Sequence, residues 1–154
     1  MKRWKRAEGK KGFTLVELIV VLVILAILIA MLVPALTGYI DKAKDKKAEA
    51  KMKLIEKAAV TAYDEVIAKY PDEEITGLTY NSKAPQDTEY GKLFESELRS
   101  LVEGDVNLDN LSVLWIHMKS GSHEIESISL TYIEDGKTYI CERDAEGKLV
   151  FSKQ

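Results

Sequence analysis

Residues 10–21 of the chain read Lys-Lys-Gly-Phe-Thr-Leu-Val-Glu-Leu-Ile-Val-Val, which joins a basic segment to an apolar one. The apolar run opens at Phe13, and beyond Glu17 it contains no other polar residue as far as Val33. A carboxylate in hydrocarbon is costly unless it reaches water, takes up a proton or finds a partner. Two interpretations of Glu17 are therefore open: a functional group with a partner, or a side chain close enough to the lipid headgroups to stay hydrated.

The segment before the apolar run, residues 1–12, is a basic leader with six Lys or Arg residues and one Glu. Positive charge beside an apolar span marks the cytoplasmic side of a membrane, so the chain beyond residue 36 is expected outside. As a helix, residues 13–36 would span roughly 36 Å, which exceeds the roughly 30 Å of a bilayer core. A helix is expected because it satisfies every backbone polar group within one span.

The sequence from Gly12 to Glu17 resembles the cleavage and assembly motif of type IV prepilins and the related pseudopilins. The resemblance implies that a membrane peptidase cuts after Gly12 and N-methylates Phe13. It also implies that Glu17 meets the amino-terminal amine of a neighbouring subunit in a filament, and that Pro34 kinks the helix. The partners it implies are further copies of the chain, a prepilin peptidase and methyltransferase, an assembly platform with its ATPase, minor pilins and the membrane; no cofactor is expected.

Residues 37–70 are expected to continue as an amphipathic helix, because most apolar positions from Leu36 to Tyr70 are three or four residues apart. The opposite face is charged and rich in lysine, and Pro71 is expected to end the helix. The apolar stripe needs a cover, and the expected cover is the chain's own C-terminal region. The lysines of residues 42–57 are expected to face solvent or neighbouring acidic heads rather than DNA or lipid.

Residues 71–154 are expected to form a globular head with a polar loop, a short helix that ends before Gly104, and about four antiparallel strands. The loop, residues 71–92, holds at most a short strand. Strand-like runs cover residues 111–118, 125–133, 137–143 and 148–152, and Asp135-Gly136 predicts a tight hairpin turn. The expected fold class is α+β, with a long N-terminal helix packed on an antiparallel sheet, and this order also resembles the pilin fold.

Charge and motifs argue against several other functions. The whole chain has a net charge of −3 and the leader contributes +5, which leaves −8 from Phe13 onward, so the head does not attract nucleic acid by bulk charge. The sequence contains no phosphate-binding loop, nucleophile elbow or glycine fingerprint, and no enzyme activity is expected. His117 and His123 lack a metal-ligand set, and His117, Trp115 and Phe151 are expected in the core.

The single cysteine, Cys141, cannot form a disulfide within the chain and is expected to be a small buried residue. The carboxylates of Glu103, Asp105 and Asp109 could supply oxygen ligands to calcium. Their spacing matches no calcium-binding loop, so no metal site is predicted.

Three functional hypotheses remain at this point. In the first, the chain is a subunit of a type IV pilus with a role in adhesion, twitching motility or biofilm formation, held in the cytoplasmic membrane by a single span before it reaches the cell surface. In the second, it is a pseudopilin or minor pilin of a type II secretion or DNA-uptake system. In the third, it is a membrane-anchored domain that never polymerises; a secretory signal peptide cut near Ala35 is a further rival for the apolar run.

Overall fold

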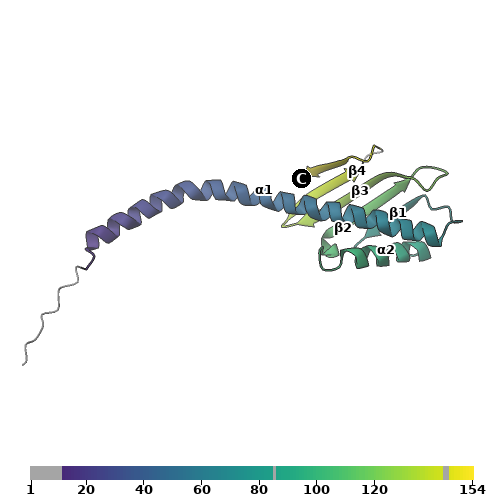
Figure 1. Ribbon diagram of the computed structural model, residues 1–154, viewed down its shortest axis with the longest axis horizontal. Coiled ribbons are helices and arrows are strands. Elements are labelled where there is room, and N and C mark those ends of the chain that lie inside the picture. The colour runs from purple at the N-terminus through teal and green to yellow at the C-terminus, as the bar shows by residue number, and fades with distance from the viewer. Residues whose placement is uncertain (1–11, 85, 144–145) are drawn as a thin grey trace, which may run out of the picture. The chain divides into compact units, whose positions relative to one another are not determined.

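The computed structural model describes residues 12–84, 86–143 and 146–154. In chain order, its elements are helix α1 (Leu15–Lys69), strand β1 (Gly77–Asn81), helix α2 (Glu89–Val102), the short 3-10 helix η1 (Leu108–Asn110), and strands β2 (Leu111–Met118), β3 (Ile125–Glu134), β4 (Lys137–Arg143) and β5 (Leu149–Lys153) (Figure 1). The chain divides into two compact units between Ala43 and Lys44, and each unit is described by itself.

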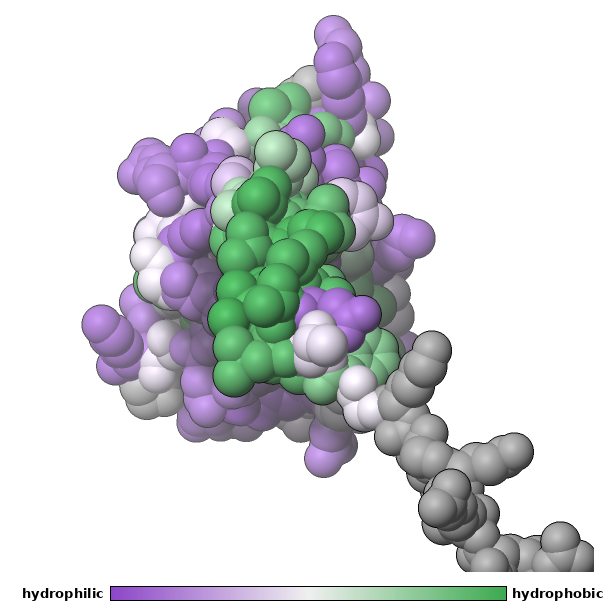
Figure 2. Space-filling view, turned by 90° about the vertical axis from the view of Figure 1, so that its left-hand side faces the viewer, coloured by the Kyte–Doolittle hydropathy of each residue, from purple (hydrophilic) through white to green (hydrophobic). Residues whose placement is uncertain are grey.

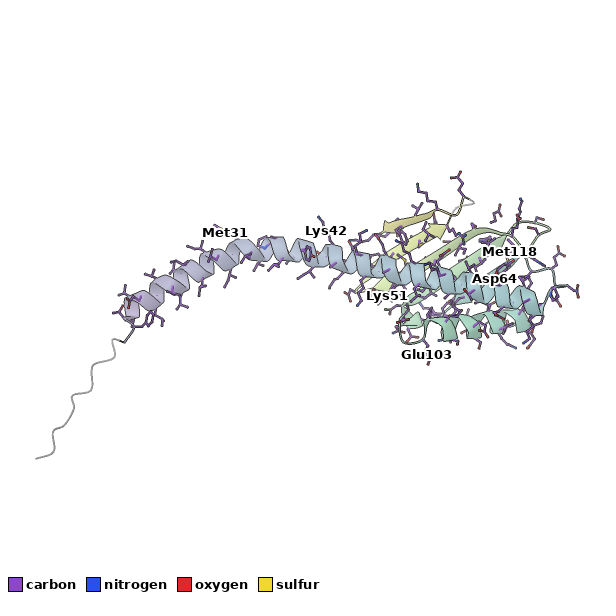
Figure 3. All side chains as sticks on the ribbon, in the orientation of Figure 1. Met31, Lys42, Lys51, Asp64, Glu103 and Met118 are labelled. Carbon is purple, nitrogen blue, oxygen red and sulfur yellow. The ribbon has the colours of Figure 1, made fainter. Side chains whose placement is uncertain are left out.

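The first unit is the apolar half of α1. The helix passes through Pro34 without a break in its assignment, and from Leu15 to Ile40 every large apolar side chain is at least 47% exposed. These side chains give the segment a largely hydrophobic surface (Figure 2), and Met31 projects from the helix without a neighbour to cover it (Figure 3). A helix that is apolar on all sides requires a protein or lipid environment to cover it.

The second unit is built on a five-stranded sheet in the order β1-β2-β3-β4-β5, and every neighbouring pair is antiparallel. Successive side chains of a strand point to opposite faces, so one face of this sheet receives the buried residues. One cross-strand row of this inward face joins Tyr80, Leu114, Leu130 and Cys141, which are at most 1% exposed. These side chains form one core with those of the two helices.

The C-terminal half of α1 contributes its apolar stripe to this core. Ala48, Met52, Ile55 and Ala59 are fully buried, while many lysines of this half of the helix, such as Lys53 and Lys57, are exposed. Helix α2 adds Phe94, Leu98 and Val102 from its own apolar face. The expectation that the chain's own C-terminal region covers the stripe is therefore confirmed for the second unit.

Polar contacts fix α1 against the sheet at several points. Asp45 accepts hydrogen bonds from Tyr139 Oη at 2.9 Å and from Lys153 Nζ at 2.7 Å. Lys51, labelled in Figure 3, pairs with Glu134. Burial, and after it the Asp45 carboxylate, raises the pKa of Tyr139 to about 12. The Lys153 ammonium, followed by the Tyr139 hydroxyl, lowers the pKa of Asp45.

The fold class predicted from the sequence is confirmed, with one more strand than the expected four. The additional strand is β1, which lies in the region expected to hold at most a short strand and pairs along its whole length with β2. Strands β2 and β4 have the predicted bounds, and α1 ends at Lys69, just before Tyr70-Pro71. The predicted leader lies outside the described residues apart from Gly12.

The prediction that Trp115 and His117 are core residues is wrong. Both occupy outward positions of β2, where Trp115 is 46% exposed, while Leu114 and Ile116 take the inward positions. The strand is apolar on both faces, so its composition did not reveal which face the core would take. Phe151 is partly buried and packs against the core, and Cys141 is a free, buried thiol as expected.

Candidate processing and assembly site

The bond between Gly12 and Phe13 lies in a short segment without regular structure, directly before α1. Phe13 is 83% exposed, and among the described residues beyond its chain neighbours none has an atom within 4 Å of the position that a Cβ would take on Gly12. Exposed, non-helical backbone next to small residues is the kind of chain that a protease can bind. The described residues therefore leave this bond exposed.

Glu17 lies in the first turn of α1, where it forms a reciprocal pair with Thr14. The Thr14 backbone N–H donates to Glu17 Oε2 at 2.8 Å, and the Thr14 hydroxyl donates to the same oxygen at 2.7 Å. In return, the Glu17 backbone N–H donates to Thr14 Oγ1 at 3.2 Å. This arrangement is a capping box, in which two backbone N–H groups that have no partner inside the helix are satisfied by side chains.

The capping box gives the Glu17 carboxylate a partner within its own chain. Two donors from Thr14 and the positive end of the helix dipole both stabilise the charged form at the start of α1. A carboxylate has about four acceptor positions, so it can accept a donor from another molecule while it keeps both bonds to Thr14. Capping its own helix and pairing with another subunit are therefore compatible roles for Glu17.

Thr14 is the residue of this site that the sequence analysis missed. The signal was present in the sequence, because Thr14 and Glu17 have the spacing of a capping box just before an apolar run. The unusual position of a carboxylate in an apolar segment directed the interpretation toward a partner in another subunit. The structure shows that Glu17 also has a partner within its own chain, Thr14.

Pro34 lies inside α1, about five turns beyond Glu17. Proline has no backbone N–H, so the carbonyl four residues earlier loses its helical donor. The Thr37 hydroxyl donates to the Pro34 carbonyl oxygen at 2.9 Å, which supports the backbone in this turn. The kink at Pro34 remains a prediction.

Within the described ranges, the side chains form no group of three or more His, Cys, Asp or Glu residues that could hold a metal ion. Among the helices that the structure describes, α1 is the one that is long and apolar enough to cross a membrane, by length and composition. The described groups at the N-terminal site are an exposed peptide bond, one carboxylate and an apolar helix.

A family sequence model described as the prokaryotic N-terminal methylation motif matches residues 9–33. The chain carries the class signal of type IV pilins and pseudopilins. The matched segment contains the Gly12–Phe13 bond, the capping box and most of the apolar run, and it ends just before Pro34. No curated protein and no solved structure gives a match.

The motif and the fold together describe a pilin-like protein. A long N-terminal helix on a five-stranded antiparallel sheet is a pilin-like α+β arrangement, and the motif marks a structural protein rather than an enzyme. The motif also implies processing by a prepilin peptidase. With the apolar helix, it indicates that the pilin-like protein is anchored in the inner membrane before assembly.

Proposed function

We propose that the chain is a structural subunit of a type IV pilus, synthesised as a prepilin. A prepilin peptidase cleaves between Gly12 and Phe13 and methylates the new amine of Phe13, and the mature chain then polymerises through its N-terminal helix. The observation that supports this proposal most strongly is the methylation motif at residues 9–33, whose apolar part forms the start of a helix with an exposed apolar surface on all sides.

The physical basis of this assembly is an exchange of one apolar environment for another. Leaving lipid removes the cover from the apolar half of α1, and a bundle of the same helices from other copies restores it. The head keeps its own core, because the buried stripe of α1 begins only at Ala48. Polymerisation can therefore proceed without unfolding the head.

Glu17 determines how neighbouring helices align when the apolar helix moves from lipid into the filament. A buried carboxylate without a full set of partners is costly, and the new amine of Phe13 in an adjacent subunit would supply a charged donor. A packing arrangement that brings the amine of one subunit to the carboxylate of the next is favoured over arrangements in which the two helices are shifted along each other. In this role, Glu17 keeps its capping bonds to Thr14 and adds one partner from outside.

Two variants separate the charge of Glu17 from its capping role. Glu17→Gln retains a side-chain oxygen for the Thr14 N–H but removes the charge, whereas Glu17→Ala removes both. We expect both variants to be inserted and cleaved, and both to yield at least about tenfold fewer filaments by electron microscopy, because the charged contact between subunits is lost. Normal filament numbers from Glu17→Gln would contradict the charge-pairing role.

The alternative within the same class is a pseudopilin or minor pilin of a secretion or DNA-uptake system. Glu17 is present in this chain, and this favours a subunit of the filament body over one at its tip. Long surface filaments in which this chain is the most abundant protein would support the pilus subunit. Short filaments that remain within the cell envelope would support the pseudopilin.

A further inference from the structure

One face of the sheet points away from the core, and we call it the outer face. Register and alternation bring two complete rows across the five strands to this face, one through Trp115 and one through Val113. Its hydroxyl-bearing residues are Thr79, Ser127, Ser129, Thr131, Thr138 and Ser152. Its large apolar residues are Val113, Trp115, Ile133, Ile140 and Val150.

The outer face is almost free of charge, in a chain where 31% of residues are charged. Among the described outward positions that pair across the strands, Glu142 is the one Asp, Glu, Lys or Arg. Glu126 is also exposed, at the register shift near one end of β3. A sheet face in water ordinarily alternates apolar inward positions with polar outward ones, and charged side chains are common there. A ligand that covers this face would remove mainly hydroxyls and apolar groups from water. The cost of desolvating charged groups would therefore be small.

Trp115 is the most prominent side chain of the outer face. Its cross-strand neighbours are Thr79 on β1 and Ser129 on β3, which are much smaller, so the indole stands above them and is 46% exposed. The His117 ring stacks on it at a centroid distance of 5.9 Å and an interplanar angle of 5°. This contact supports one side of the indole, and a supported aromatic ring loses less entropy when it binds a ligand.

We propose that the outer face binds a neutral polysaccharide, with Trp115 as the main contact. The face of a sugar ring presents C–H bonds of partial positive charge, which suit the negative face of an indole. The surrounding Ser and Thr hydroxyls both donate and accept hydrogen bonds, as sugar hydroxyls do. The described outward positions that pair across the strands include no Lys or Arg for an anionic polymer, and one carboxylate, Glu142, for a cationic one.

The size of the face favours a chain-like ligand over a second copy of the protein. Five strands about 4.8 Å apart and three outward residues along a strand give an area of roughly 24 by 17 Å, or about 400 Å². A stable protein–protein interface buries about 800 Å² on each partner. A row of about 24 Å across the strands is long enough for several linked sugar units.

The test uses the full chain in detergent micelles, with Trp4→Phe so that Trp115 is the only tryptophan. The probes are three neutral hexasaccharides (of β-1,4-linked glucose, α-1,4-linked glucose and β-1,4-linked N-acetylglucosamine) and one anionic oligogalacturonate. We expect at least one neutral probe to change the Trp115 fluorescence in a saturable manner. We expect no saturable change with the anionic probe.

Variants show whether the binding belongs to the outer face. In isothermal titration calorimetry, Trp115→Ala is expected to weaken binding of the neutral probe at least tenfold, and Trp115→Phe to weaken it less. Leu101→Ala is the matched control, because Leu101 is 42% exposed but lies on α2. It is expected to bind as the parent chain does, and circular dichroism confirms that each variant is folded.

Three outcomes would overturn the proposal. They are the absence of binding to every neutral probe, binding that Trp115→Ala leaves unchanged, and self-association through this face, detected as a dimer in sedimentation that Trp115→Ala abolishes. None of these measurements requires cleavage or polymerisation. A negative result for polysaccharide binding would therefore leave the filament proposal unchanged, and a negative result for filaments would leave the binding proposal unchanged.

Discussion

At the scale of single residues, the amino-terminal site is a compact set of local contacts. Thr14 and Glu17 satisfy each other's backbone N–H groups, and Phe13 stands exposed just before them. The carboxylate is therefore held at a fixed place at the start of the helix before any second subunit arrives. A fixed carboxylate loses less entropy on pairing than a freely rotating one.

Removing the hydroxyl of Thr14 should loosen the start of α1. Thr14→Ala removes the acceptor for the Glu17 N–H, and the loss of such a cap costs about 1 kcal/mol of helix stability. We expect faster amide hydrogen exchange in the first turn, with Thr14→Ser as the control that keeps the wild-type rate. Unchanged protection in Thr14→Ala, measured by NMR in micelles, would show that the capping box does not hold the helix end.

Cys141 should be unreactive while the head is folded. Burial, followed by the nearby Glu56 carboxylate, raises the pKa of the thiol to about 11, and the residue is 1% exposed. Only the thiolate is a nucleophile, so at about pH 8 the reaction with a disulfide reagent should be roughly a hundredfold slower than in the unfolded chain. The control is the same chain in denaturant, and equal rates in the two states would contradict the buried position.

At the scale of elements, the spacing of apolar residues predicted the helices and strands well. A spacing of three or four residues marks the buried face of a helix, and alternation marks the buried face of a strand. This spacing predicted the ends of β2 and β4 and the end of α1 near Pro71. It could not assign the inward face of β2, since Val113 and Trp115 are as apolar as Leu114 and Ile116. The pairing register of β2 decides which of its faces turns inward. That register depends on pairing partners that are distant in sequence, such as Leu130 of β3.

The ties between α1 and the sheet are also long-range, and sequence reasoning did not find them. Asp45 contacts Tyr139 and Lys153, which lie about a hundred residues further along the chain. Glu56 is buried and pairs with Arg143 at 3.1 Å. A lysine-rich helix face indicates which charges are present but not which residue of the sheet each will meet.

The Asp45 contacts predict a specific dependence of stability on pH. The Lys153 ammonium, followed by the Tyr139 hydroxyl, lowers the pKa of Asp45 from 3.8, so its contribution is complete above that pH and is lost as the pH falls through the lowered value. We expect Asp45→Asn to be less stable than the parent chain at neutral pH and equally stable at strongly acidic pH. Urea unfolding followed by Trp115 fluorescence, with Trp4→Phe in both chains, measures both stabilities. A stability difference that persists in acid would contradict this explanation.

At the scale of the whole molecule, the two units of the chain differ in whether their apolar residues are covered within the chain. The first unit exposes an apolar helix surface that requires a cover, and the second unit has a complete core of its own. Apolar residues are concentrated in the first quarter of the chain, which is why the sequence indicates a segment that needs a lipid or protein cover. The sequence did not predict the nearly uncharged outer face, because that surface is assembled from alternate residues of five separate strands.

The measurement that tests the central claim most directly is the mass of the N-terminal peptide of the protein isolated from the cell surface. The account predicts a chain that begins at Phe13 and is heavier by one methyl group on its amine. A Gly12→Val variant should keep its leader, because the residue before the cut would no longer be glycine. An intact leader on the surface protein, or a chain that begins near Ala35, would contradict the processing and filament proposals.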